Sequence, residues 1–298
     1  MRVTQSMMSN SLLKNISSGY SQLADYQNQL STGKKITRAS QDPVVATMGI
    51  SYRTDVSHVE QYQKNVTNAY KWLDSSDDAL QQVNDVLNRI RELTNEASTD
   101  TYTADQRAAA GVEVDQLTQQ LVTLGNTQVG GQYIFSGSDS ANPLLTQASD
   151  GTVTINNLAQ KNPDFNVAVN DGIQMTINVS PDSVFNDQLF KDLNQLKTDL
   201  TEGTATASQI SAHLTEIDTH LDEVASAQAD LGAKTNRIDM VQNRLADQKT
   251  VATKIMSNNE DADYAETIVK LNQQQNVYNA SLSVGAKIIQ TSLVDFLN

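Results

Sequence analysis

The sequence predicts a mainly α-helical protein with a small antiparallel β domain inserted between its helices, arranged as an elongated helical rod that ends in a coiled coil. Apolar residues recur at alternating steps of three and four over most of the chain, which is the coiled-coil period, whereas residues 131–185 alternate with a period of two. Aromatic residues make up only 5% of the 298 residues, and prolines number four. With so few large side chains, long thin helices suit this chain better than a thick globular core.

A first helix is predicted to end at Gly33, since glycine is a common residue at helix C-termini. Its seam, with one polar interruption, consists of Leu13, Ile16, Tyr20, Leu23, Gln27 and Leu30. A polar linker, residues 34–41, follows. Asp42 and Pro43 are typical of a helix start, with Asp42 as N-cap and Pro43 at the first helical position. We therefore predict an interdomain joint at Gly33, Asp42 and Pro43.

A helix of about 55 residues is predicted from Pro43 to Ala97, roughly 80 Å long at 1.5 Å per residue. Its apolar row has one member in every seven residues, at Val59, Val66, Leu73, Leu80 and Leu87. A further helix is predicted from Thr103 to Asn126. The helix of about 55 residues is far longer than the average helix of a globular protein. Such a length favours an architecture in which subunits stack over one that encloses a substrate.

The inserted β domain is predicted over residues 131–185. Short runs of alternating apolar and polar residues lie there beside dipeptides that favour hairpin turns. The runs are 153–155, 165–169 and 173–179, and the dipeptides are Asp150-Gly151 and Asp171-Gly172.

Helical periodicity returns after the insert. A short helix is predicted from Asp187 to Leu200, and a second long helix from Ile210 to about Ser257. The last helix extends the seam to the C-terminus, with Tyr264, Ile268, Leu271, Gln275, Tyr278, Leu282, Gly285, Ile289, Leu293 and Phe296.

This nested order predicts three domains. Residues 1–41 and 260–298 form a terminal coiled-coil assembly domain, residues 42–130 and 186–259 form a helical rod domain, and residues 131–185 form an outer β domain. Both chain ends are expected at one end of the rod, with the β domain at the other.

Charge is nearly absent from the terminal helices. Residues 3–33 carry only Lys14 and Asp25, and residues 271–286 carry no charge. Because a buried unpaired charge costs several kcal/mol, this pattern favours outer faces that also become buried. The hypothesis is that both termini are disordered in the monomer and fold together on polymerisation. A self-contained intramolecular coiled coil with an uncharged exterior fits the same residues. The predicted assembly seam is Leu13, Ile16, Tyr20, Leu23, Leu30, Ile268, Leu271, Tyr278, Leu282, Ile289, Leu293 and Phe296.

Composition disfavours several classes of function. The net charge of −14 argues against nucleic-acid binding, which needs a clustered basic surface, and against docking on anionic membranes. The chain has no cysteine, which excludes disulfides and thiolate sites. Residues 1–10 lack the features of a secretory signal, and no stretch reaches the ~20 apolar residues of a membrane span. These features fit a cytoplasmic protein and, equally, one exported without a cleavable signal.

No catalytic, cofactor-binding or metal-binding constellation is predicted, and we expect a protein that is not an enzyme. His213 and His220 lie about 10 Å apart along a helix axis, too far to share one metal. Glu216 lies four residues before His220, so a surface ion pair between these two is expected. The acidic run at residues 74–78 lacks the glycine-punctuated spacing of a calcium loop.

Two segments resemble the flagellin superfamily. Residues 30–46 read LSTGKKITRASQDPVVA and resemble its N-terminal signature, with one extra residue, Gln41, before the matching Asp42. Residues 268–298, which end in LVDFLN, resemble its C-terminal region. Within the superfamily, the opening Met1–Met7 and the segment GQYIFSGSD at 131–139, followed by Asn142-Pro143, resemble the hook-associated proteins of the hook–filament junction.

The resemblance implies a structural subunit that assembles with itself into a ring or helical array. That array joins the hook, through hook-associated protein 1, to the flagellin filament. The resemblance also implies secretion in an unfolded state by the flagellar type III apparatus, with an export chaperone holding the C-terminal helix. The expected location is the bacterial flagellum, at the junction of hook and filament. No cofactor, nucleic-acid partner or membrane partner is implied.

Two other functions fit the sequence. A flagellin-type filament subunit can have this length, although residues 133–139 and the brevity of the β insert favour the junction adaptor. A secreted adhesin would bind a ligand with residues 131–185 and use the helices as a stalk. Saturable ligand binding by residues 131–185 alone would identify the adhesin.

Overall fold

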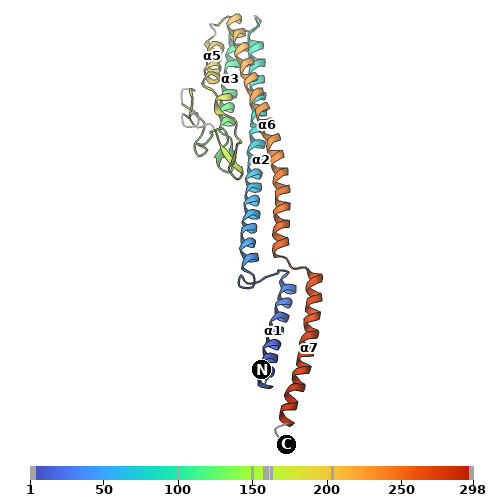
Figure 1. The fold of residues 1–298 in the computed structure, drawn as a ribbon. Coiled ribbons are helices and arrows are strands. Elements are labelled where there is room, and N and C mark those ends of the chain that lie inside the picture. The colour runs from blue at the N-terminus through green and yellow to red at the C-terminus, as the bar shows by residue number, and fades with distance from the viewer. Residues whose placement is uncertain are drawn as a thin grey trace. The chain divides into compact units, whose positions relative to one another are not determined.

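The computed structural model describes residues 5–99, 101–148, 151–156, 161, 164–202 and 205–294, and the side chains from residue 7 to residue 287 within those ranges. Most of the described chain is helical, which confirms the predicted fold class (Figure 1). The helices are α1 (Gln5–Thr32), α2 (Pro43–Ala97), α3 (Ala104–Gly125), α5 (Asp187–Glu202), α6 (Ala207–Glu260) and α7 (Tyr264–Val294). Among the described residues, no helix contains a stretch long and apolar enough to cross a membrane.

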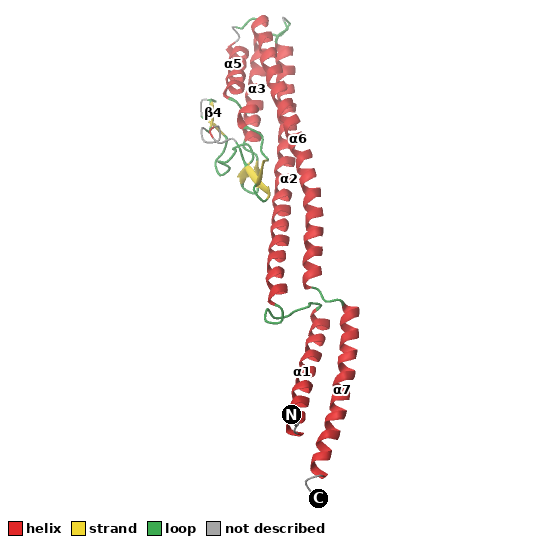
Figure 2. Cartoon of the chain, in the orientation of Figure 1, coloured by secondary structure: helices red, strands yellow, loops and turns green. Residues whose placement is uncertain are grey.

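The strands lie between α3 and α5 and pair as antiparallel hairpins (Figure 2). They are β1 (Gln128–Val129), β2 (Gln132–Tyr133), β3 (Leu145–Gln147), β4 (Val153–Ile155), β5 (Asn166–Asn170) and β6 (Ile173–Thr176). Within the described ranges, β1 pairs only with β2, β3 with β4, and β5 with β6. The predicted small antiparallel insert is confirmed, as separate hairpins and not as one continuous sheet.

Glycines with a positive φ make the hairpin turns. Gly130 (φ 61°) and Gly131 (φ 82°) are the two residues between β1 and β2. A two-residue turn of type I′ needs a positive φ at both positions, which glycine adopts without strain. Gly172 (φ 65°) lies between β5 and β6, and Gly151 (φ 88°) lies between β3 and β4. These two glycines are the second residues of the dipeptides predicted to form hairpin turns, although Asp150 lies outside the described residues.

The chain divides into two compact units. Unit 1 contains Met1–His58 and Gln248–Asn298, so it holds α1, α7, the start of α2 and the end of α6. Unit 2 is Val59–Asp247, which holds the rest of α2 and α6, together with α3, α5 and the hairpins.

Unit 2 contains the hydrophobic core. Every buried hydrophobic side chain among the described residues lies between Val66 and Leu245. On the long helices these side chains recur every seven residues, as Val66, Leu73, Leu80 and Leu87 on α2 and as Ile210, Ile217, Val224, Leu231, Ile238 and Leu245 on α6. This repeat is the one predicted from the sequence, and it produces a continuous apolar strip along each helix. The helix α5 adds four buried leucines, Leu189, Leu193, Leu196 and Leu200.

Aromatic pairs lie where the hairpin region joins the helices of unit 2. Trp72 of α2 stacks on Phe165, just before β5, with ring centroids 4.7 Å apart. Phe135 and Phe185 meet edge to face at 5.1 Å, and both are fully buried. Pairs of this kind contribute about 0.5–1.5 kcal/mol beyond the area that they bury. The β insert is therefore anchored in the same core as the long helices.

Candidate assembly interface

The terminal helices α1 and α7 lie side by side within unit 1 (Figure 1). Two glycines mark their close approach. The side-chain amide of Gln274 donates a hydrogen bond to the carbonyl of Gly19 at 3.3 Å. A Cβ placed on Gly285 would lie 2.9 Å from a methyl carbon of Leu12, closer than real contacts of this kind. Small residues at these two positions allow the helices to pack closely.

No described hydrophobic side chain of α1 or α7 is buried. Burial of apolar surface is the main favourable contribution to folding, at about 25 cal/mol per Å², and this helix pair obtains little of it. Helices without such packing are marginal in water. The pair in unit 1 therefore differs in kind from the long helices of unit 2.

The residues of the predicted assembly seam fall into two groups. Half-buried members are Ile16, Leu23, Leu30, Leu271 and Tyr278. Exposed members are Leu13, Tyr20, Ile268 and Leu282, with 43–65% of their surface accessible. The side chains of Ile289 and Leu293 and the whole of Phe296 lie outside the description. The pairing of α1 with α7 thus leaves much of the seam open, and its role in assembly stays a prediction.

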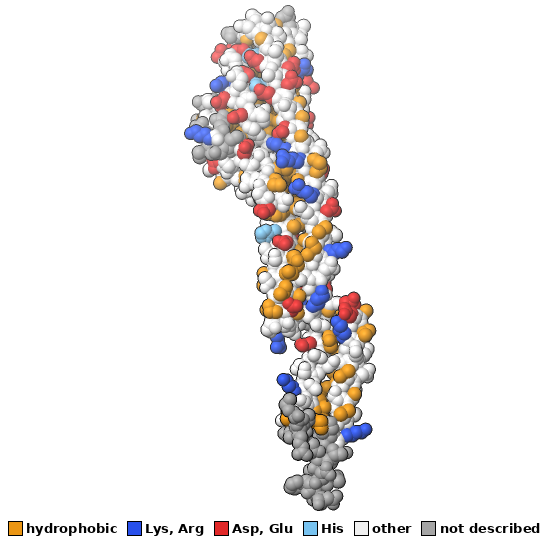
Figure 3. Space-filling model, in the orientation of Figure 1, with side chains coloured by type: hydrophobic (Ala, Val, Ile, Leu, Met, Phe, Trp, Pro, Cys, Tyr) orange, Lys and Arg blue, Asp and Glu red, His pale blue; other side chains and the backbone are white. Residues whose placement is uncertain are grey.

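Three further exposed apolar residues on α7 were missed by the sequence reasoning. Val269, Val277 and Val284 recur at steps of eight and seven, so they share one side of the helix, and each has more than half of its surface accessible. Apolar and uncharged polar side chains dominate the visible face of α7 (Figure 3). The signal available in the sequence was a second apolar row within the charge-free segment 271–286 and just before it.

The linkers between the helices of unit 1 are fixed by backbone hydrogen bonds. Gly33 has a φ of 70°, its N–H donates to Gln29, and its carbonyl accepts from the N–H of Ala262 at 2.9 Å. The carboxylate of Asp42 accepts from two backbone N–H groups at the start of α2, each at 3.0 Å, and Pro43 is the first residue of α2. These are the local conformations predicted for Gly33, Asp42 and Pro43, while their function as an interdomain joint stays a prediction.

A buried carboxylate, Glu260, joins the two linkers. Its Oε1 lies 2.7 Å from Nε of Arg53, and its Oε2 lies 2.8 Å from Nη2 of Arg53 and 3.3 Å from Nζ of Lys34. Nζ of Lys34 also lies 2.7 Å from Oδ1 of Asp261. The hydrogen bonds from Arg53, and then from Lys34, hold the pKa of Glu260 below its ordinary value despite burial. The carboxylate is therefore charged in this network at neutral pH.

Glycine at position 49 makes room for this network. A Cβ added to Gly49 would lie 2.8 Å from Oε1 of Glu260. The sequence did not identify Glu260, because a single acidic residue at the end of a long helix carries no pattern that distinguishes it from other surface carboxylates. The visible signal was the basic pair Lys34-Lys35, which the structure places against the last residues of α6 and the adjoining Asp261.

The predicted surface ion pair between Glu216 and His220, one of the two histidines of α6, is wrong. His220 does not pair with Glu216 on the surface; both histidines are buried, and each bonds to a carboxylate of α5 and to a glutamate three residues further along α6. The wrong prediction came from the assumption that this face of α6 is solvated, whereas α5 covers it. Among the described residues, no cluster of histidine and acidic side chains has the arrangement of a metal site.

Comparison with known proteins gives consistent matches. Residues 3–140 match the bacterial flagellin N-terminal helical region, and residues 214–297 match the bacterial flagellin C-terminal helical region. The chain is 25% identical to flagellar hook-associated protein 3 of Escherichia coli, over 94% of this chain and 95% of that protein. It is also 25% identical to a flagellin of Clostridium tyrobutyricum, over 59% of this chain and 45% of that protein.

Solved structures share the fold. A putative flagellar hook-associated protein from Vibrio parahaemolyticus superposes with a TM-score of 0.66 and 19% identity, covering 74% of this chain and 100% of that one. FlgL of Bacillus cereus superposes with a TM-score of 0.57 and 25% identity, covering 70% of this chain and 99% of that one.

The contrast in burial predicts a contrast in local stability. In the free monomer, amide hydrogens of α1 and α7 should exchange much faster than those of α2 from residue 66 onward, because local opening of α1 and α7 exposes no buried core. Hydrogen exchange followed by mass spectrometry measures both regions in one sample. Equal protection of the terminal and central helices would support the self-contained coiled coil instead.

Replacement of Glu260 tests the joint. In Glu260→Gln the negative charge is lost, so Arg53 loses its ionic partner, which should destabilise the linker network by about 1–3 kcal/mol. Faster amide exchange at residues 33–53 and 257–264 would reveal this.

The contribution of Glu260 also depends on pH. Because the pKa of Glu260 is lowered in the folded state, its stabilisation is fully present above the ordinary pKa of a glutamate and is lost as the pH falls through the folded-state pKa.

A matched control for this variant is Glu266→Gln. Glu266 is an exposed carboxylate of unit 1 that pairs with Lys270 one turn along α7, and exposed pairs contribute little. Exchange in the linkers should not change in the control. If both variants behave alike, the buried network does not fix the joint.

Proposed function

Because this chain belongs to the bacterial flagellin family and is a structural component of the flagellum, we propose that it polymerises as the junction adaptor between hook and filament. In this role it contacts the hook through hook-associated protein 1 and presents a surface on which flagellin assembles. The family consists of structural subunits, so the prediction that the chain is not an enzyme is confirmed.

One observation carries the choice of adaptor over filament subunit. The match to hook-associated protein 3 extends over 95% of that protein, whereas the match to the flagellin of Clostridium tyrobutyricum extends over 45% of it. A match along nearly the whole length of one hook-associated protein supports the adaptor. A filament subunit remains the alternative that the experiment below distinguishes.

The mechanism rests on the incomplete burial of α1 and α7. We propose that residues 1–41 and 260–298 act as the assembly domain, in which the open seam and the valine row of α7 are covered by neighbouring subunits. The charge-free faces make this possible, because they can be desolvated without leaving unpaired charges. Folding of both helices is completed by assembly, so that monomers do not aggregate through a preformed apolar surface.

The remaining parts follow from this division. Residues 42–130 and 186–259 would provide the stable helical domain, and residues 131–185 the outer β domain. Export in an unfolded state, with a chaperone holding α7, would suit helices that are marginal on their own. The proposed location is the hook–filament junction of the secreted flagellum.

A strain that lacks this gene tests the junction role. We expect electron microscopy to show hooks without filaments, and we expect flagellin to accumulate in the culture medium. The reason is that, in the proposed role, this chain provides the surface on which flagellin assembles. Normal hooks and filaments would argue for the adhesin, and disappearance of the filament subunit from every fraction would mean that the chain is itself the flagellin.

Charged substitutions in the seam test the assembly surface. Ile16→Asp and Leu282→Asp each place a carboxylate where a neighbour should bury an apolar side chain, at a cost of several kcal/mol. Incorporation into flagella should fall by about 100-fold or more, while circular dichroism shows that unit 2 remains folded. Ile16→Val and Leu282→Met are controls that should retain incorporation. Full incorporation of both aspartate variants would refute the proposed seam.

A further inference from the structure

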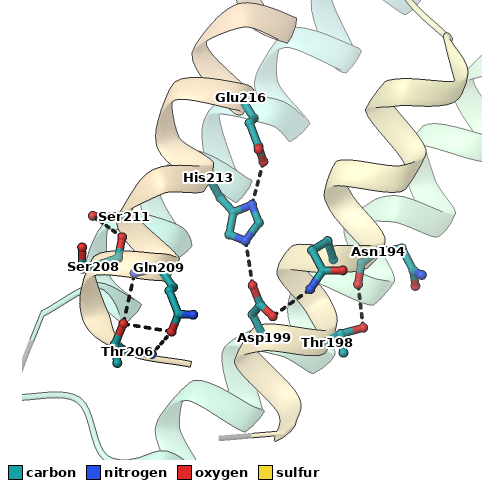
Figure 4. Close-up of polar contacts among 10 residues, drawn as sticks. Asn194, Thr198, Asp199, Thr206, Ser208, Gln209, Ser211, His213 and Glu216 are labelled. Atoms are coloured by element: carbon teal, nitrogen blue, oxygen red, sulfur yellow. Dashed lines mark hydrogen bonds and ion pairs between the residues drawn. The ribbon is translucent and has the colours of Figure 1, made fainter. Parts of the chain in front are cut away.

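Two histidine clamps hold α5 against α6 within unit 2. In the first, Nε2 of His213 lies 2.9 Å from a carboxylate oxygen of Asp199 on α5, and Nδ1 lies 2.7 Å from Glu216 on α6 (Figure 4). In the second, Nε2 of His220 lies 2.9 Å from Asp192 on α5, and Nδ1 lies 3.0 Å from Glu223 on α6.

The two clamps are copies of one arrangement. The aspartates, the histidines and the glutamates are each seven residues apart, which is two helical turns, and α5 runs antiparallel to α6. Each aspartate also accepts a hydrogen bond from a glutamine four residues before it, at 2.9 Å for Asp199 and 2.6 Å for Asp192. A chance contact would not repeat with every partner in register.

Each clamp requires a doubly protonated imidazole ring. An ionised carboxylate only accepts hydrogen bonds, whereas a neutral imidazole has one donor nitrogen and one acceptor nitrogen. When both ring nitrogens face carboxylate oxygens, a neutral ring would turn a lone pair toward one of them. Both nitrogens donate only in the imidazolium cation, and hydrogen bonds between ionised partners are the stronger kind.

Both histidines are buried where α5 covers α6. The two rings are 8% and 5% exposed. Charged side chains from the other packed helices are already paired, Arg91 of α2 with Asp218 of α6 and Asp115 of α3 with Lys197 of α5. Burial lowers the pKa of His213, while the bonds to Asp199 and then Glu216 raise it, and the net shift is upward.

We propose that His213 and His220 form a pH-sensitive double clamp, which fastens α5 to α6 when both rings are protonated and loosens when they lose their protons. The four buried leucines of α5 keep the helix docked, so deprotonation weakens the contact and does not remove it. Because α5 connects the β insert to α6, the clamps control how firmly the end of that insert is held.

The direction of the pH effect follows from the raised pKa of His213. A group whose pKa is higher in the folded state stabilises that state fully below its unfolded value, about 6.5 for histidine. The stabilisation is lost as the pH rises through the folded-state value. Unit 2 should therefore become less stable under alkaline conditions.

Imidazole nitrogen NMR on the wild-type full-length chain tests the protonation state without any substitution. At pH 6 we expect both ring nitrogens of His213 and His220 to carry protons, and at alkaline pH we expect the signals of a neutral ring. His58, the third histidine, is exposed on α2 and serves as the internal reference. A neutral tautomer at either buried position at pH 6 overturns the proposal.

Urea unfolding as a function of pH tests the clamp itself. From pH 6 to pH 9, the unfolding equilibrium constant of the wild type should rise about tenfold or more relative to that of His213→Gln/His220→Gln, because glutamine can donate to one carboxylate but carries no charge. The control His58→Gln should follow the wild type. Parallel pH profiles for the wild type and the double variant would contradict the clamp.

Discussion

The structure depends on where apolar side chains are buried. One strip of them, repeated every seven residues along α2 and α6, fills the core of unit 2, and α3, α5 and the aromatic pairs of the hairpin region are packed onto it. The hairpins are short, and two-stranded ribbons of this kind are marginal in isolation. Their order comes from Phe135, Phe165 and Phe185, which connect them to the core that the long helices create.

Unit 1 is organised by polar contacts instead. A buried carboxylate, Glu260, collects Arg53 and Lys34, and backbone hydrogen bonds tie the linkers together. Such a network fixes the conformation of the linkers but adds little net stability, because desolvation of the charges offsets much of their attraction. Polar order at the linkers is therefore combined, within unit 1, with apolar exposure on α1 and α7.

The sequence predicted the features that depend on local pattern. Heptad spacing identified the long helices, Thr103 and Asp42 marked helix starts, and Asp171-Gly172 marked a turn that the structure contains. Contacts between distant segments were out of reach. No local signal shows that Glu260 meets Arg53, 207 residues away along the chain. Nor does one show that α5 folds back over the face of α6 that carries His213, because both contacts depend on how the helices pack.

The confinement of buried apolar surface to unit 2 also determines which part of the free subunit contributes to the unfolding signal in calorimetry. The heat capacity change of unfolding comes mainly from apolar surface that becomes exposed. A calorimetric melting curve of the monomer should therefore report the unfolding of unit 2, with little contribution from α1 and α7. Under the proposed role in assembly, a substitution in α1 or α7 can leave the melting curve of the monomer unchanged and still prevent motility.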